Sequence, residues 1–145
     1  MGKRAVLCIF LALAITGCGS TVAATPAPTA TPSAGVFVQT QHAGGYAITL
    51  KVVPAAFGTN TFTVTVKDKQ AKAIDGGSVL IQTQSLDMDM GVQSAQLKAM
   101  GASAPGSYSG QTELTMPGDW DITVKVLPPK AKDFITTNFK FIVGI

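Results

Sequence analysis

The sequence predicts an all-β domain over residues 35–145, and three observations lead to this prediction. Apolar and polar residues alternate over several short segments, which is the period of a half-buried strand. The chain contains 15 glycines and 8 prolines, so turns are frequent. No segment keeps the 3.6-residue period of an amphipathic helix, so we expect no helix beyond a short turn.

The alternation is clearest in two segments. Over 61–67, Phe62, Val64 and Val66 point to one face, and threonine and lysine side chains point to the other. Over 120–126, the apolar positions are Trp120 and every second residue after it. The same pattern predicts seven or eight strands, and the number depends on the first segment, in which the alternation is weakest. The segments are 36–41, 46–52, 61–67, 79–84, 95–100, 108–115, 120–126 and 138–143.

Seven or eight short strands, each with one apolar face, indicate an antiparallel β-sandwich. The spacing of the turns favours an immunoglobulin-like topology over a closed barrel, which would need more even strand lengths. The cysteine pair of antibody domains is absent, so aromatic and branched side chains must hold the sheets together. Trp120 is the expected core anchor, packed against Phe62 or Phe139.

The first 17 residues have the features of a bacterial lipoprotein signal peptide. Lys3 and Arg4 give a positive start, and residues 5–15 form an apolar run, which is shorter than the roughly 20 residues that span a bilayer. Small residues then lead to Cys18 in the order ITGC, which resembles the lipobox whose cysteine is lipidated. An ordinary secretory signal cut nearby is the alternative. We favour lipidation because Cys8 lies in the removed segment, which would leave Cys18 without a disulfide partner.

Residues 18–34 are expected to tether the folded domain to membrane lipid through Cys18. After the cysteine, the stretch is rich in alanine, threonine and proline, so it cannot bury a core and favours extended backbone. At about 3.1 Å per residue, it could hold the domain up to roughly 50 Å from the bilayer. The sequence therefore predicts an exported domain that is anchored to the extracytoplasmic face of a bacterial membrane.

The charge balance argues against a nucleic-acid partner. The chain has 11 basic and 8 acidic side chains. Two of the basic residues, Lys3 and Arg4, lie in the signal peptide, so 11 minus 2 leaves 9 lysines against 8 acids in the rest. A nearly neutral chain without a basic cluster lacks the electrostatic pattern of a nucleic-acid binder.

Three short motifs resemble those of the YtkA-like domain family. The sequence reads DMDMG over 87–91, PGSYSG over 105–110 and MPGDW over 116–120. The resemblance covers roughly residues 35–143, and the pattern is also similar to the periplasmic part of FixH-type oxidase-assembly proteins. It implies an exported, immunoglobulin-like domain of a kind often found in lipoproteins or beside copper-handling membrane proteins. Family members often carry a histidine just after the methionine-glycine turn, whereas Val92 follows Gly91 here.

The methionines are the candidate metal ligands. Thioether sulfur suits Cu(I), and an oxidising compartment makes thiolate sites hard to maintain. Met88 and Met90 are two residues apart, so in extended backbone their side chains leave on the same face. Met116 follows a predicted strand, and Met100 is expected to emerge near solvent. We expect Met88, Met90 and Met116 to converge at one end of the domain, with His42 as a further candidate ligand.

Other readings of these residues stay open. Methionine commonly fills core gaps, and Met116 in particular could serve packing alone. The carboxylates Asp87, Asp89, Asp119 and Asp121 could bind calcium, but no loop of alternating acids with a closing glutamate is present. We expect no enzymatic activity, because serine-histidine chemistry would have to use the single histidine and no nucleophile elbow is present.

Two functions therefore compete. One is a Cu(I)-associating module for copper trafficking, resistance or oxidase assembly, with envelope copper-handling proteins as partners. The other is a metal-free protein-interaction module of the cell envelope. Exposure of Met88 and Met90 would favour the first, and their burial against Trp120 would favour the second.

Overall fold

The computed structural model describes residues 35–144, so the expected signal peptide (1–17), Cys18 and the tether (18–34) lie outside the described residues. The described part contains eight strands and one short 3-10 helix, η1 (Gly101–Ser103). The strands are β1 (Phe37–Ala43), β2 (Tyr46–Val53), β3 (Gly58–Lys67), β4 (Ser78–Ser85), β5 (Gln93–Ala99), β6 (Ser107–Leu114), β7 (Gly118–Leu127) and β8 (Ile135–Val143). The predicted all-β class is confirmed.

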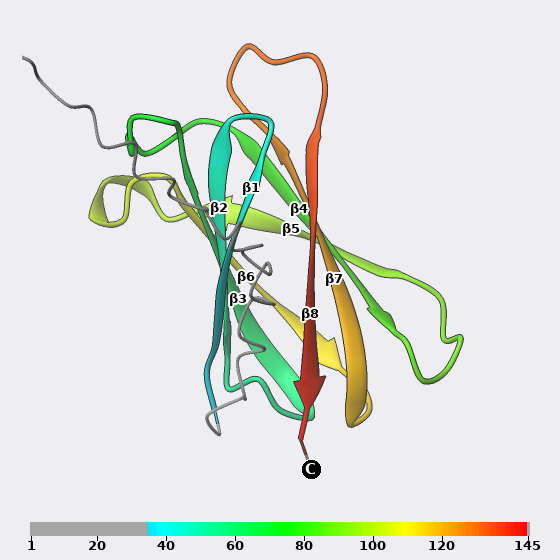
Figure 1. The fold of residues 1–145 in the computed structure, drawn as a ribbon. Coiled ribbons are helices and arrows are strands. Elements are labelled where there is room, and N and C mark those ends of the chain that lie inside the picture. Colours follow the sequence, from blue (N-terminus) through cyan, green and yellow to red (C-terminus); the bar gives the residue numbers. More distant parts are fainter. Residues whose placement is uncertain (1–34, 145) are drawn as a thin grey trace, which may run out of the picture.

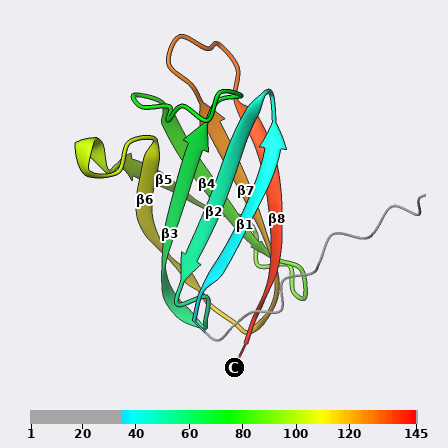
Figure 2. The same ribbon diagram turned by 60° about the vertical axis from the view of Figure 1, so that its left-hand side comes forward.

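The eight strands form one antiparallel sheet in the order β1-β2-β3-β6-β5-β4-β7-β8 (Figures 1 and 2). Its two edge strands, β1 and β8, come into contact. The rings of Phe37 and Phe141 stack with their centroids 4.8 Å apart, and Ala56 forms an isolated bridge with Gly144. The sheet is therefore nearly closed and barrel-like, and the expected immunoglobulin-like sandwich is not confirmed in its particulars.

Strand β5 makes the sheet continuous, because it pairs with a different neighbour at each end. Its first part follows β4, from Thr83 opposite Gln93 to Val79 opposite Leu97. Its last residues instead pair with β6, through Lys98 with Ser109 and Ala99 with Tyr108. The pairing of β5 with β6 is confined to these two residue pairs.

The register defines two ends of the domain, which we call the base and the apex. At the base, the start of β1 lies beside the end of β2, and the chain enters the domain at residue 35. The base also carries the connections 54–57, 86–92 and 115–117. The apex carries the turn 44–45 and the connections 68–77, 100–106 and 128–134. In Figure 1 the apex is uppermost, with the orange 128–134 connection at the top and the C-terminus at the bottom.

The core follows the predicted alternation. In β3, Phe62, Val64 and Val66 are fully buried, and their neighbours face outward or are partly exposed. Trp120 is buried, which agrees with its expected role as a core anchor. The large buried side chains of residues 35–144 belong to one cluster. Residues 35–144 therefore contain a complete core.

Candidate metal-binding site

The connection 86–92 between β4 and β5, which we call the methionine loop, is a tight turn that exposes both of its methionines. The Oδ1 atom of Asp89 accepts the backbone N–H of Gly91 at 3.3 Å, and Met90 N–H donates to the carbonyl of Met88 at 3.0 Å. Gly91 has a φ of +75°, a conformation that favours glycine. Met88 is 57% exposed and Met90 is 50% exposed. These two side chains are thus presented to solvent on a hydrogen-bonded turn.

The methionine loop is fixed to the start of β7 by two hydrogen bonds. Leu86 N–H donates to the carbonyl of Asp119 at 2.8 Å, and Asp119 N–H donates to Oδ2 of Asp87 at 2.8 Å. Gly118 has a φ of +121°, and the carboxylate of Asp87 occupies the space that a Cβ at Gly118 would need. The DMDMG and MPGDW motifs therefore meet in the fold, and Asp87 is the side chain that joins them.

Met116 lies in the connection 115–117 at the same end of the domain. It is partly buried and packs against the core. Its backbone carbonyl accepts the indole N–H of Trp120 at 3.1 Å. The connection is consequently held by the core anchor, and the side chain of Met116 has a packing role.

His42 lies away from the methionines. It is exposed on β1 opposite Ala47, next to the apex turn 44–45. Val53, at the base, is six residues after Ala47 along extended strand, which corresponds to about 20 Å at roughly 3.3 Å per residue. The structure thus brings Met88, Met90 and Met116 to one end and leaves His42 near the other. Sequence reasoning had no access to the strand register that decides this.

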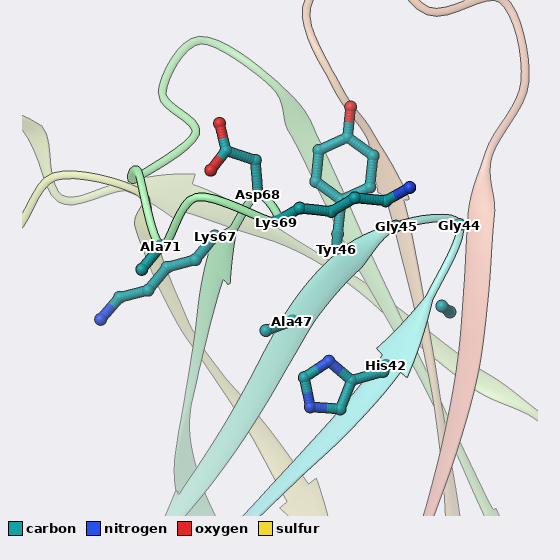
Figure 3. Close-up of a pocket in the computed structure, with 10 residues that line it drawn as sticks. His42, Gly44, Gly45, Tyr46, Ala47, Lys67, Asp68, Lys69 and Ala71 are labelled. Carbon is teal, nitrogen blue, oxygen red and sulfur yellow. The ribbon is translucent and has the colours of Figure 1, made fainter. Parts of the chain in front are cut away.

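His42 instead borders a depression at the apex, which Figure 3 shows. Its other polar lining residues include Tyr46, Lys67, Asp68 and Lys69. In Figure 3 the ammonium groups of Lys67 and Lys69 point in different directions and do not converge on the imidazole. No motif in the sequence marks these residues, and the depression offers no focused set of ligands.

The carboxylates at the base are mostly engaged in structural hydrogen bonds. Asp87 and Asp89 accept backbone N–H groups, as described above. Asp121 accepts the side-chain amide of Asn138 at 3.3 Å. Within residues 35–144, no group of three or more histidine, cysteine or acidic side chains is arranged to hold a metal ion. The donor set that the base offers is therefore thioether sulfur, which fits Cu(I) and does not fit calcium.

The PGSYSG motif serves the apex and not the candidate site. The hydroxyl of Tyr108 donates to the carbonyl of Ile74 at 2.8 Å and accepts the N–H of Gly77 at 3.1 Å. Gly106 N–H donates to the carboxylate of Asp75. These bonds hold the connection 68–77 in place, so this motif is structural.

The described residues contain no helix of the length and apolarity that crossing a membrane requires.

Comparisons with known proteins agree with the motif assignment. The YtkA-like family model matches residues 40–125. A comparison with curated proteins found no match to this chain.

Solved structures of similar fold include three that cover nearly the whole of their own chains. A DUF4426-family protein from Pseudomonas aeruginosa PAO1 aligns with a TM-score of 0.59 and 15% identity, over 72% of this chain and 96% of its own. FetP from uropathogenic Escherichia coli strain F11 aligns with a TM-score of 0.60 and 11% identity, over 76% of this chain and 97% of its own. A copper-bound variant of the same FetP aligns with a TM-score of 0.58 and 12% identity, over 74% of this chain and 97% of its own. At these identities the likeness establishes the fold, while the family-model match covers more than half of the sequence. This chain is a member of the YtkA-like family.

Proposed function

We propose that this protein is a lipid-anchored extracytoplasmic module that binds Cu(I) through methionine thioethers at the base of its β-domain. The ligands would be Met88 and Met90, with Met116 as the third sulfur at the same end. The observation that carries the proposal is the exposure of Met88 and Met90 on a loop that Asp87 fixes to the start of β7, which follows the connection that contains Met116. The role would lie in copper trafficking, resistance or oxidase assembly.

Packing does not explain the two exposed methionines. Methionine in a core contributes by filling gaps, but about half of the surface of Met88 and of Met90 lies in solvent. Thioethers bind soft ions, and Cu(I) is the soft ion that they suit best among biological metals. Because the loop backbone is already held by hydrogen bonds, little backbone entropy would be lost when the loop binds an ion.

The comparisons add support at the level of the fold. FetP, which shares this fold at 12% identity or less, has been solved with copper bound in a variant form. Membership of the YtkA-like family agrees with an exported location. We further propose that the domain is a variant of the immunoglobulin-like sandwich in which β5 joins the two sheets.

The remaining parts of the proposal concern residues at other places in the chain. Cys18 would carry the lipid and hold the protein on the extracytoplasmic face of the membrane. His42 is left out of the proposed site because the strand register separates it from the methionines. No catalytic role is proposed.

A metal-free interaction module is the second candidate, and one observation favours it. The methionine loop also exposes Leu86 and Val92, which have no metal-donor atoms. An apolar loop of this kind is suited to contact with another protein of the envelope.

An anaerobic Cu(I) titration against a colorimetric chelator separates the two candidates. Residues 35–145, which contain the complete core, would be compared with the double variant Met88→Leu and Met90→Leu. Leucine keeps the volume and apolarity of methionine and removes the sulfur. Met100→Leu is the matched control, because Met100 is also exposed but follows β5 at the apex.

Copper binding predicts stoichiometric competition by the parent and by Met100→Leu, and loss of competition in the double variant. If the double variant still competes like the parent, the thioether site is wrong. If no protein competes, the methionines belong to an apolar interaction surface and the second candidate takes its place.

A further inference from the structure

Exposed apolar side chains are concentrated at the base of the domain. Ten large apolar side chains are exposed among residues 35–144, and only Met100 and Phe134 of these lie at the apex. The other eight lie on elements that start, end or turn at the base. Such a concentration on one end of a small domain marks a contact surface.

The methionine loop supplies half of this surface. Its exposed apolar residues are Leu86, Met88, Met90 and Val92, each separated from the next by one residue. Copper binding would use the two sulfurs only. The proposed function therefore leaves Leu86 and Val92 unexplained.

The second half follows the seam between the two edge strands. Val36 directly precedes β1, Val38 is the second residue of β1, and Ile142 lies near the end of β8. Phe57, in the connection 54–57, is 60% exposed and follows Ala56, which forms a bridge across the seam with Gly144.

The two halves are continuous. Ile142 pairs with Asp119, which is the residue that binds the methionine loop through its backbone. We call the combined surface the apolar rim, and its members are Val36, Val38, Phe57, Leu86, Met88, Met90, Val92 and Ile142.

The point at which the chain enters the domain indicates what the rim would contact. Residue 35 enters the domain at the base, directly before Val36, and the expected lipid attachment at Cys18 lies 17 positions earlier in the sequence. Because the tether enters at the base, the base can reach the bilayer with less of the tether extended than the apex would require. We propose that the apolar rim rests on the surface of the membrane to which Cys18 is attached; this inference relies on the lipid anchor of the proposed function.

The tether also makes a weak contact effective. Linking a module to its target converts binding into an intramolecular event with an effective concentration of about 1 mM for a short flexible linker. A rim with an affinity of only about 0.1 mM for the lipid surface would then be in contact most of the time. The rim does not need to be apolar enough to bind a membrane by itself.

The charges define the kind of lipid surface. The methionine loop and the start of β7 carry Asp87, Asp89 and Asp119, whereas Lys51, opposite Val38, and Lys140, on the face of β8 that carries Ile142, lie beside the seam. These five side chains sum to one negative charge. Four other lysines lie in the apex connections 68–77 and 128–134. An anionic surface would repel these carboxylates, so the rim is suited to zwitterionic headgroups. A basic protein partner would be attracted to the same carboxylates, and the test must tell it apart from lipid.

The test attaches residues 18–145 to vesicles through the thiol of Cys18, the only cysteine in this segment, by means of a maleimide lipid. Hydrogen–deuterium exchange would then be compared between phosphatidylcholine vesicles and the same protein capped with a soluble maleimide. We expect the amides of 55–57 and 86–92 to exchange on the order of tenfold more slowly on vesicles, which follows from the effective concentration of about 1 mM and the affinity of about 0.1 mM given above. The connection 128–134 should exchange equally in both.

Two variants test whether the rim causes the protection. Phe57→Ser with Leu86→Ser should abolish it, and Phe134→Ser should not, because Phe134 is 51% exposed at the apex and serves as the matched control. Addition of phosphatidylglycerol should reduce the protection. Neither variant removes a sulfur, so a Cu(I) titration of the same proteins reports separately on the proposed copper site.

Several outcomes would overturn the inference. Equal exchange of the base on vesicles and in solution would show that the rim does not contact lipid. Protection that rises with the density of protein on the vesicle would show contact between copies, and protection that requires a basic peptide would show a protein partner. Because the maleimide supplies the anchor, a negative result counts against contact of the rim and leaves lipidation of Cys18 to be tested by lipid labelling.

Discussion

Gly118 is the position at which one added methyl group tests the link between the methionine loop and β7. A Cβ at Gly118 would overlap Oδ2 of Asp87, and the φ of +121° is unfavourable for any residue with a side chain. Gly118→Ala must therefore strain the backbone and displace the carboxylate that accepts Asp119 N–H. The variant should loosen the loop without altering a methionine.

The expected loss of stability is the sum of two effects. Backbone strain at such a φ costs about 1–2 kcal/mol. Loss of the Asp87–Asp119 hydrogen bond costs about 1 kcal/mol, since both residues are exposed and water can replace the carboxylate. Gly118→Ala should thus lower the free energy of unfolding by about 2–3 kcal/mol, which corresponds to a decrease in Tm on the order of 10 °C. Gly58→Ala is the matched control, because Gly58 has a φ of +100° and no atom within 4 Å of an added Cβ.

A double-mutant cycle measured by urea unfolding completes the test. Asp87→Ala alone should cost about 1 kcal/mol, but close to nothing in the Gly118→Ala background, where the carboxylate is already displaced. The difference is a coupling free energy of about 1 kcal/mol. Additive effects of the two substitutions would refute the reasoning, as would a Gly118→Ala variant that is no less stable than Gly58→Ala.

Three further substitutions test the interior by equilibrium urea unfolding. Tyr108→Phe removes two hydrogen bonds to the backbone of 68–77 and should destabilise the domain by about 2 kcal/mol; an unchanged midpoint would mean that water replaces the hydroxyl. Thr83→Val should raise stability by about 1 kcal/mol, because the buried Oγ1 of Thr83 has no partner among the described residues. A destabilised valine variant would indicate a hidden polar partner. Asn60→Ala should cost about 3 kcal/mol, since this fully buried side chain makes three hydrogen bonds to the 54–58 backbone, and a loss below that of Tyr108→Phe would contradict this ranking.

Alternation along the chain was sufficient to predict the strands and their buried faces. Phe62, Val64 and Val66 illustrate why, since period-two patterning follows directly from the geometry of a strand with one buried face. The neighbours of each strand were harder to predict, because parity identifies a face and not a partner. β5 shows this limit: its sequence gives no sign that it pairs with β4 first and with β6 only at its end.

The candidate site was predicted only in part, because a local pattern does not show which distant residues meet in the fold. The sequence left open whether Met88 and Met90 are exposed or buried against Trp120, and both are exposed in the structure. The separation of His42 depends on how distant strands are paired, which a local pattern does not contain. The role of Asp87 also escaped sequence reasoning, because its carboxylate fills the space at Gly118, a residue distant in sequence.

The contact between β1 and β8 has a consequence for the order of events during folding. The first and last strands of the domain stack through Phe37 and Phe141, so the seam closes only after nearly the whole chain is available. A contact of such sequence separation forms slowly, because the entropy of closing a long loop must be overcome first. A nascent chain that ends before β8 would leave one edge of the sheet open to pairing with other chains. We therefore expect truncations just before residue 135 to aggregate, even though they retain seven of the eight strands.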